Sequence, residues 1–143
     1  MLGYLPNELQ RENRALSYHN FAIQPLVMLV LFGEANGENL SVLNNNSLAR
    51  LVDRVLHGID KPEIFQQVTG IEQEVDGLLE PWSLAWLEPY LSRYPLPATG
   101  LLELSSLRAM KNSRLGGDLT WLFYDPSKPA KVQNVYVEQV EQE

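Results

Sequence analysis

The feature that most constrains this fold is an apolar segment that runs from Phe21 to Phe32 and is interrupted by Gln24. It is about twelve residues long, whereas a membrane-spanning helix needs about twenty apolar residues. We therefore expect a buried element of a protein core and no membrane span. The polar cluster RENRALSYHN begins just before this segment. Together the two stretches predict one helix from near Arg11 to the turn FGEANG, with Gly37 as a left-handed cap.

Pro25 lies inside this segment. A proline within a helix removes a backbone donor and clashes with the preceding turn, so we expect the helix to kink at Pro25 or to begin afresh there. A buried strand from Phe21 to Phe32 is the alternative, because periodicity alone does not separate a short apolar strand from a buried helix.

Two later segments have the pattern of further helices. Asn46 or Ser47 can cap the first of these, in which five apolar residues recur at three- and four-residue spacing: Leu48, Leu51, Val52, Val55 and Leu56. Pro62 is expected in the first turn of a second, short helix through PEIFQQV.

A third helix is expected over SLAWLEPYLSRY, with Ser83 as its cap. Its apolar stripe would contain Leu84, Leu87 and Leu91, and Pro89 predicts a bend. The later sequence RLGGD lacks a phosphate-loop pattern and predicts a tight turn.

Near the C-terminus, DLTWLFYD and VQNVYVEQV are rich in aromatic and β-branched residues and flank a proline-containing turn. This pattern predicts a small C-terminal β-hairpin. The other segments have helical patterns, so the expected fold class is all-α (mainly α). A chain of 143 residues has the usual length of one domain, and we expect residues 1–143 to form a single domain.

The composition excludes several classes of function. A formal net charge of −7 argues against a nucleic-acid binder, which needs a basic surface. The absence of cysteine excludes disulfides and thiolate ligands. His19 and His57 are far apart, with no carboxylate at a ligand spacing, so we expect no metal site. The start MLGYLPNELQ has no basic segment followed by an apolar stretch, so no secretion signal is seen there.

The cluster RENRALSYHN contains the candidate chemistry. If it is helical, Arg11 and Tyr18 lie within about 20° of one face, with Arg14 between them. Nearby cations favour the phenolate form of a tyrosine, and arginine binds a carboxylate through its planar fork. A tyrosine that moves protons beside such an arginine suits elimination from a uronic acid. A solvated surface or a helix-end network is the alternative interpretation.

The segment LPNELQRENRALSYHNFAIQPLVMLVLFGEANG resembles the mannuronate-specific alginate lyases. These are polysaccharide lyases with an α/α-toroid fold, in which an arginine precedes the catalytic tyrosine by seven residues. The later segments NNNSLARLVDRVLHGIDKPEIF, LAWLEPYLSRYP and KNSRLGGDLTWLF are similar to that family in the same order. The resemblance implies antiparallel helical hairpins that form part of an α/α toroid.

By this resemblance, Tyr18 matches the tyrosine that protonates the leaving oxygen and that, on mannuronate, also takes the C5 proton. Arg11 matches the arginine that neutralises the substrate carboxylate, and Arg14 and His19 are expected to help bind the anionic substrate. The implied function is a poly-β-D-mannuronate lyase that acts on alginate by β-elimination and leaves a 4,5-unsaturated uronate end. No metal or organic cofactor is implied, and the implied location is periplasmic or secreted.

The family also uses an asparagine–histidine pair in an earlier NNHSYW-type segment, for which this sequence has no counterpart. The sequence LNNN at 43–46 follows the tyrosine and has no histidine after it. We therefore expect the C-terminal part of a lyase, with half of the site. An incomplete toroid leaves an apolar face uncovered, so homo-oligomerisation, or association with a chain that supplies the N-terminal half, is expected. The alternatives are a non-catalytic alginate-binding or degenerate lyase fragment and an unrelated helical interaction module.

Overall fold

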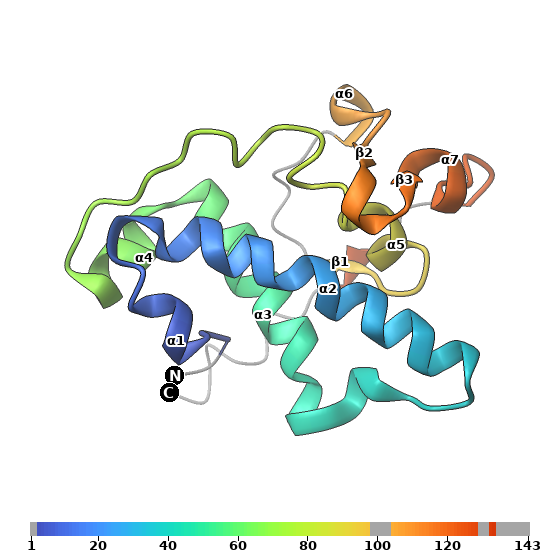
Figure 1. Cartoon of the computed structure of the whole chain (residues 1–143), viewed down its shortest axis with the longest axis horizontal. Coiled ribbons are helices and arrows are strands. Elements are labelled where there is room, and N and C mark those ends of the chain that lie inside the picture. Colours follow the sequence, from blue (N-terminus) through green and yellow to red (C-terminus); the bar gives the residue numbers. More distant parts are fainter. Residues whose placement is uncertain (1–2, 98–103, 129–131, 134–143) are drawn as a thin grey trace.

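The structure is a computed structural model that describes residues 3–97, 104–128 and 132–133. This part of the chain is mainly helical, as expected (Figure 1). Its two long helices are α2 (Ala15–Ala35) and α3 (Leu43–Asp60). The chain reverses through the short 3-10 helix η2 (Leu40–Val42), and α3 then returns and packs across α2.

The remaining elements are short. The helical ones are α1 (Pro6–Leu9), the 3-10 helix η1 (Glu12–Arg14), α4 (Glu63–Thr69), α5 (Leu87–Leu91), α6 (Leu104–Leu107), the 3-10 helix η3 (Ser113–Leu115) and α7 (Leu119–Phe123). Strand β1 (Leu96–Pro97) pairs in parallel with β4 (Val132–Gln133), and β2 (Lys111–Asn112) pairs antiparallel with β3 (Gly117–Asp118).

Helix α2 contains the apolar segment and continues through Pro25. The alternatives of a buried strand and of a fresh start at Pro25 are therefore wrong. The helix begins at Ala15 rather than near Arg11, because Glu12 has a left-handed backbone (φ 55°) that a right-handed helix does not accommodate. Gly37 has φ 80° just after the helix ends, which confirms the predicted left-handed residue at this end.

The stretch Glu12–Ala35 is, among the described residues, long and apolar enough to cross a membrane by length and composition. The twelve-residue estimate from the sequence was shorter, because the helix extends beyond the apolar run at both ends. In the structure Ile23, Val27 and Val30 lie in the core with residues of α3 and α5. Four other large apolar side chains of α2 are exposed: Phe21, Leu26, Leu29 and Phe32.

Helix α3 has the buried face that its apolar spacing predicted. All five residues of that pattern are buried: Leu48, Leu51, Val52, Val55 and Leu56. Right-handed helical backbone begins only after Asn46, because the three asparagines at 44–46 have φ between 50° and 56°. The right-handed helix therefore begins where it was expected, while a cap formed by Asn46 or Ser47 stays a prediction; the Ser47 hydroxyl donates to the carbonyl oxygen of Leu43 at 3.3 Å.

A second, smaller core joins the start of α2 to α4. Leu16 and Phe65 are fully buried there and pack with Ala15 and Leu78. Gly58 of α3 permits this contact, since a Cβ at that position would lie 2.6 Å from Cε2 of Phe65 and 2.7 Å from Cδ1 of Leu16. Pro62 immediately precedes α4, one residue before the expected first-turn position.

Only α5 forms within the helix expected over residues 83–94. Residues 83–86 are turns and a bend. Ser83 does not cap α5, because this helix begins at Leu87 with Trp86 at the N-cap position; the Ser83 hydroxyl accepts a hydrogen bond from Asn20 Nδ2 at 2.8 Å. Pro89 lies in the first turn of α5, where a helix needs no backbone donor. The expected cap is therefore wrong, and Pro89 marks a helix start.

The C-terminal hairpin is also corrected. Residues Leu119–Phe123 form α7, whose first turn is capped by the Asp118 side chain, which accepts a hydrogen bond from Trp121 N at 2.9 Å. Val132–Gln133 pairs with β1 and not with this segment. Residues 134–140 of the expected second strand lie outside the described residues. The tight turn at RLGGD is confirmed, because Gly116 and Gly117 have φ of 111° and 113°.

Candidate active site

Arg11 and Tyr18 lie next to each other. The Arg11 guanidinium carbon is 4.8 Å from the centroid of the Tyr18 ring, within the range of a cation–π contact. The contact does not arise from a continuous helix, since Arg11 precedes η1 and Tyr18 lies in the first turn of α2. The chain therefore brings the two side chains together through the tight turn at Glu12.

Arg11 also pairs with Glu8, at 3.3 Å between Nε and Oε2. The Arg11 side chain is 54% exposed, and a surface ion pair of this kind contributes only about 0–1 kcal/mol. A carboxylate from solution can therefore replace Glu8 at small cost.

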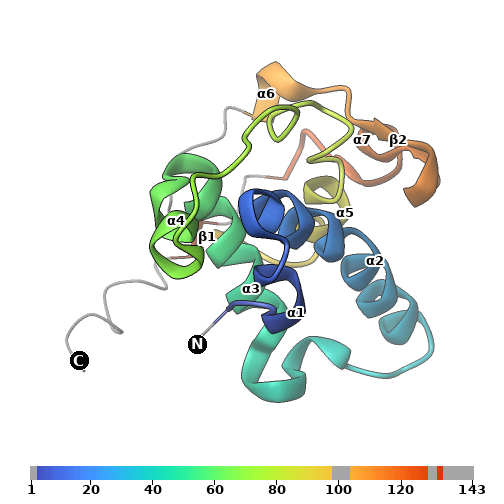
Figure 2. The same ribbon diagram turned by 60° about the vertical axis from the view of Figure 1, so that its left-hand side comes forward.

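Tyr18 lines a cavity of about 270 Å³, close to the lower end of the roughly 300–1,000 Å³ of small-molecule sites. One wall comes from α2, with Tyr18, Phe21 and Gln24, and the other from the segment between α4 and α5, with Asp76 and Trp82. That segment runs alongside the N-terminal half of α2 in both views (Figure 1 and Figure 2). Three aromatic rings and a few polar groups thus surround a space of about one sugar ring.

Asn20 holds the second wall against α2. Its Oδ1 accepts a hydrogen bond from Trp86 Nε1 at 2.8 Å, and its Nδ2 donates to the hydroxyl and the carbonyl oxygen of Ser83. The Asn20 side chain is buried, and both the oxygen and the nitrogen of its amide are hydrogen-bonded within the protein. Asn20 therefore shapes the cavity and is not offered to a ligand.

His19 is a structural residue, which corrects the prediction that it binds substrate. It is fully buried, and its Nε2 accepts a hydrogen bond from Leu5 N at 2.9 Å. Nε2 thus carries no proton, and Nδ1 donates to the carbonyl oxygen of Ala15 at 2.7 Å. Burial lowers the pKa of His19, against a smaller opposing effect of the Ala15 bond and the Glu8 charge. Both ring nitrogens are occupied, so neither can reach a substrate.

Arg14 pairs with Glu74, at 3.2 Å between Nε and Oε2, and both side chains are more than half exposed. Arg14 was expected to lie between Arg11 and Tyr18 on one face of a helix. This arrangement does not occur, because α2 begins only at Ala15. The role of Arg14 in substrate binding stays a prediction.

Sequence reasoning missed a third arginine, Arg114, whose guanidinium carbon lies 5.3 Å from the Phe21 ring centroid. Phe21 lines the Tyr18 cavity, so the turn from β2 to β3 brings a cation near that cavity. The only available signal was the segment KNSRLGGDLTWLF, in which the arginine stands next to the tight turn. Phe21, which Arg114 approaches, lies 93 positions earlier in the chain, so this local pattern does not predict the contact.

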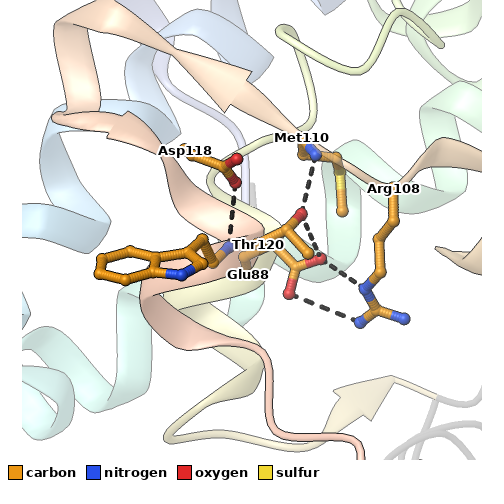
Figure 3. A network of polar contacts seen from close by, with 6 residues as sticks. Glu88, Arg108, Met110, Asp118 and Thr120 are labelled. Atoms are coloured by element: carbon orange, nitrogen blue, oxygen red, sulfur yellow. Dashed lines mark hydrogen bonds and ion pairs between the residues drawn. The ribbon is translucent and has the colours of Figure 1, made fainter.

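A polar network centred on Glu88 fixes the elements around this turn (Figure 3). Arg108 Nε donates to Glu88 Oε1 at 2.7 Å, and the Thr120 hydroxyl donates to the same oxygen at 3.3 Å. The Thr120 oxygen in turn accepts from Met110 N at 2.8 Å. The Glu88 side chain is almost fully buried. These contacts join α5 to α7 and to Met110, the residue before β2, and β2 leads into the turn that contains Arg114.

Tyr90 belongs to the main core and does not line the Tyr18 cavity. Burial, with a smaller contribution from Tyr94, raises the pKa of Tyr90 to about 12, so this core tyrosine keeps its proton at neutral pH. Within residues 3–97, 104–128 and 132–133, no group of three or more metal-binding side chains could hold a metal ion.

Comparison with known proteins shows which proteins this chain is similar to in sequence. The sequence profile of a family described as alginate lyase matches residues 2–65. The chain is 48% identical over 125 residues to an alginate lyase of Pseudomonas syringae pv. syringae (strain B728a) and 44% identical to one of Cobetia marina. Both alignments cover 87% of this chain and 33% of the relative. The chain thus spans about a third of the length of the curated relatives it matches.

The fold is similar to a solved structure, that of alginate lyase A1-III from Sphingomonas species A1. The TM-score is 0.73 at 22% sequence identity, over 87% of this chain and 35% of that chain. This similarity confirms the expected fold class. The chain is therefore similar to the alginate lyases in sequence, as the residues around Tyr18 implied, and this similarity extends over about one third of their length.

Proposed function

We propose that this chain supplies Tyr18 and Arg11 to a site that cleaves alginate by β-elimination at mannuronate. The observation that carries the proposal is the contact of 4.8 Å between the Arg11 guanidinium and the Tyr18 ring, at a cavity that Tyr18 lines. The names of the relatives support the substrate class, since they are alginate lyases.

The reaction moves one proton and breaks one bond. The C5 hydrogen of a mannuronate is acidified by the adjacent carboxylate group, and Arg11 offsets the negative charge that builds up there. The Tyr18 oxygen, as phenolate, takes the C5 proton, the C4–O4 bond breaks as the C4–C5 double bond forms, and Tyr18 returns the proton to O4. The products are a new sugar hydroxyl and a 4,5-unsaturated uronate, and Tyr18 is regenerated.

The charges around the cavity favour one orientation of a uronate. Arg11 stands on the Tyr18 side and Arg114 near Phe21, whereas Asp76 lines the opposite wall. A substrate carboxylate is attracted to the arginines and repelled by Asp76. This local arrangement lets a chain with a net charge of −7 bind a polyanion at one place.

We further propose that helices outside this chain cover exposed apolar side chains of α2. Two of these side chains, Leu26 and Leu29, line a second cavity of about 320 Å³ together with Leu40 and Leu43. A bare apolar surface of this kind promotes association in water. The partner we favour is a chain with the part of the relatives that this one does not match, which would also bring the remaining site residues. Homo-oligomerisation is the other outcome that light scattering distinguishes.

Ultraviolet absorbance of the conjugated product tests the activity. The purified chain is mixed with poly-mannuronate, alone and together with the N-terminal part of a relative. Rising absorbance in either mixture supports the proposal, and binding of the polymer without any product would indicate the non-catalytic alternative. Full activity in the presence of a chelator is expected, because no step uses a metal. The periplasmic or secreted location remains a proposal, which fractionation of the producing cells tests.

A further inference from the structure

We propose that Gln73 is a positioning residue that sets the geometry of Arg11 relative to Tyr18. The proposal rests on the roles proposed above for Arg11 and Tyr18. Gln73 lies in the segment between α4 and α5, more than fifty positions from both, and its side chain is buried.

The Gln73 amide joins the two sides of the turn that precedes α2. Its Oε1 accepts a hydrogen bond from Leu16 N at 3.0 Å, and its Nε2 donates to the carbonyl oxygen of Glu12 at 2.9 Å. Nε2 also lies within hydrogen-bond distance of Ile71 O and Thr69 Oγ1. These two last contacts anchor the amide to its own loop, so Gln73 acts as a fixed support for residues 12–16.

Gln73 supplies the acceptor that Leu16 N lacks within its helix, and it adds a second donor to the Glu12 carbonyl oxygen, which also accepts from Ala15 N. Leu16 N is one of the first four donors of α2, which have no acceptor within the helix, and the N-cap residue Arg14 makes no side-chain capping bond. Glu12 has the left-handed φ of 55°, a conformation that residues other than glycine hold only when their surroundings favour it. Gln73 therefore caps the helix and holds the turn at once.

The neighbouring residue reinforces this support. Glu74 N donates to the carbonyl oxygen of Asn13 at 2.7 Å, and its carboxylate pairs with Arg14. Arg11 stands just before the held turn and Tyr18 just after it. If the turn relaxed to right-handed backbone, the direction of the chain before Glu12 would change, and Arg11 would leave the Tyr18 ring.

The experiment measures the Arg11–Tyr18 contact directly, without any need for lyase activity. Side-chain protons of Arg11 that lie over the Tyr18 ring have upfield-shifted NMR resonances, and Tyr18→Leu gives their position without the ring. We expect Gln73→Met, which keeps the length but removes both hydrogen bonds, to move these resonances to the Tyr18→Leu position. Gln73→Glu keeps the acceptor for Leu16 N and loses the donor to Glu12 O, so it is expected to move them as well.

Val55→Ala is the matched control, because Val55 belongs to the main core, whereas Ala15 and Leu16 belong to the smaller one. The substitution should lower the unfolding midpoint and leave the Arg11 resonances in place. Retention of the upfield shift in both folded Gln73 variants would overturn the proposal, and so would an equal loss of the shift in Val55→Ala. If Gln73→Met does not fold, Gln73→Glu decides.

A kinetic arm tests the consequence for catalysis in the preparation that shows lyase activity. A displacement of about 1 Å in a site can lower the rate about a hundredfold, so kcat of Gln73→Glu is expected to fall by about that factor. KM should change much less than kcat, and Val55→Ala should keep its kcat at a temperature where it is folded. An unchanged kcat would overturn the positioning role. Absence of lyase activity both in the chain alone and in its mixture with the N-terminal part of a relative would contradict the proposed function, while the NMR result would still decide the role of Gln73.

Discussion

The Arg11 guanidinium carbon lies 4.8 Å from the centroid of the Tyr18 ring, although the left-handed residue Glu12 interrupts the backbone between them. A cation thus stands beside a phenol at the edge of a cavity that could hold one sugar ring. Under the proposed function, this relationship places the carboxylate-binding group and the proton-transfer group within reach of the same uronate. The first two predictions test the two groups separately.

Tyr18→Phe should lower any lyase activity by at least about a hundredfold, because it keeps the ring and deletes the hydroxyl that exchanges protons. Initial rates of product absorbance measure the effect. Tyr4→Phe is the control, since Tyr4 also has an arginine over its ring, Arg54 at 4.6 Å, but does not line the Tyr18 cavity. Unchanged turnover in Tyr18→Phe would remove this tyrosine from the mechanism.

Arg11→Gln should weaken both alginate binding and turnover, and Arg11→Lys should be impaired as well, because an ammonium does not reproduce the planar fork. The expected loss in kcat/KM for Arg11→Gln is at least about tenfold, the low end for a charge-assisted hydrogen bond of about 1.5–3 kcal/mol. Arg93→Gln, at the exposed ion pair with Glu34, is the matched control and should behave like the wild type. Intact binding and turnover in Arg11→Gln would exclude the carboxylate role.

Stability should fall as the pH is lowered below about 6.5, the ordinary pKa of histidine. Burial lowers the pKa of His19 in the folded chain, so the unfolded chain takes up the proton first. The stabilising contribution is therefore complete above about pH 6.5 and is lost as the pH falls toward the lower folded pKa. Urea unfolding at a series of pH values checks this. The variant His19→Gln should have a flatter profile over this window, and a slope identical to that of the wild type would show that another group is responsible.

Arg108→Met should destabilise the chain by about 3–5 kcal/mol, because it leaves the buried Glu88 carboxylate without its counter-charge. The double variant Glu88→Leu with Arg108→Met should be closer to the wild type, since the uncompensated charge is gone. Arg93→Met is the exposed control and should cost less than about 1 kcal/mol. Urea unfolding gives all three values. A double variant less stable than Arg108→Met would contradict the assignment of the cost to the buried charge.

Gly58→Ala should destabilise the chain by about 1–3 kcal/mol, the usual cost of overpacking a core. The added methyl group would lie less than 3 Å from atoms of Phe65 and Leu16. Helix propensity alone predicts the opposite sign, a gain of about 1 kcal/mol for alanine over glycine. Thermal unfolding therefore distinguishes the two effects. A variant more stable than the wild type would show that the core accommodates the added methyl group without overpacking.

The sequence by itself determined the elements whose signal is local. The five-residue apolar pattern from Leu48 to Leu56 predicted the buried face of α3, because the direction of each side chain follows from its position in its own helix. Gly37 and the pair Gly116–Gly117 were likewise predicted to be turn residues. Glycine has no Cβ and adopts left-handed backbone without a steric penalty, wherever it lies in the fold. The pairing of Arg11 with Tyr18 followed from the resemblance and from their spacing, although not through the continuous helix that the spacing suggested.

Only the tertiary structure decided the roles of the polar side chains. His19 was predicted to bind substrate, but it accepts a hydrogen bond from Leu5 N. Ser83 was predicted to cap a helix, but it accepts a hydrogen bond from Asn20. No pattern in the sequence indicated a role for Gln73. The physical reason is that a buried polar group must be paired, and its partner is whichever donor or acceptor the packing brings near. For Gln73 and Leu16 that partner is 57 positions away, a distance over which no local pattern in the sequence specifies a contact.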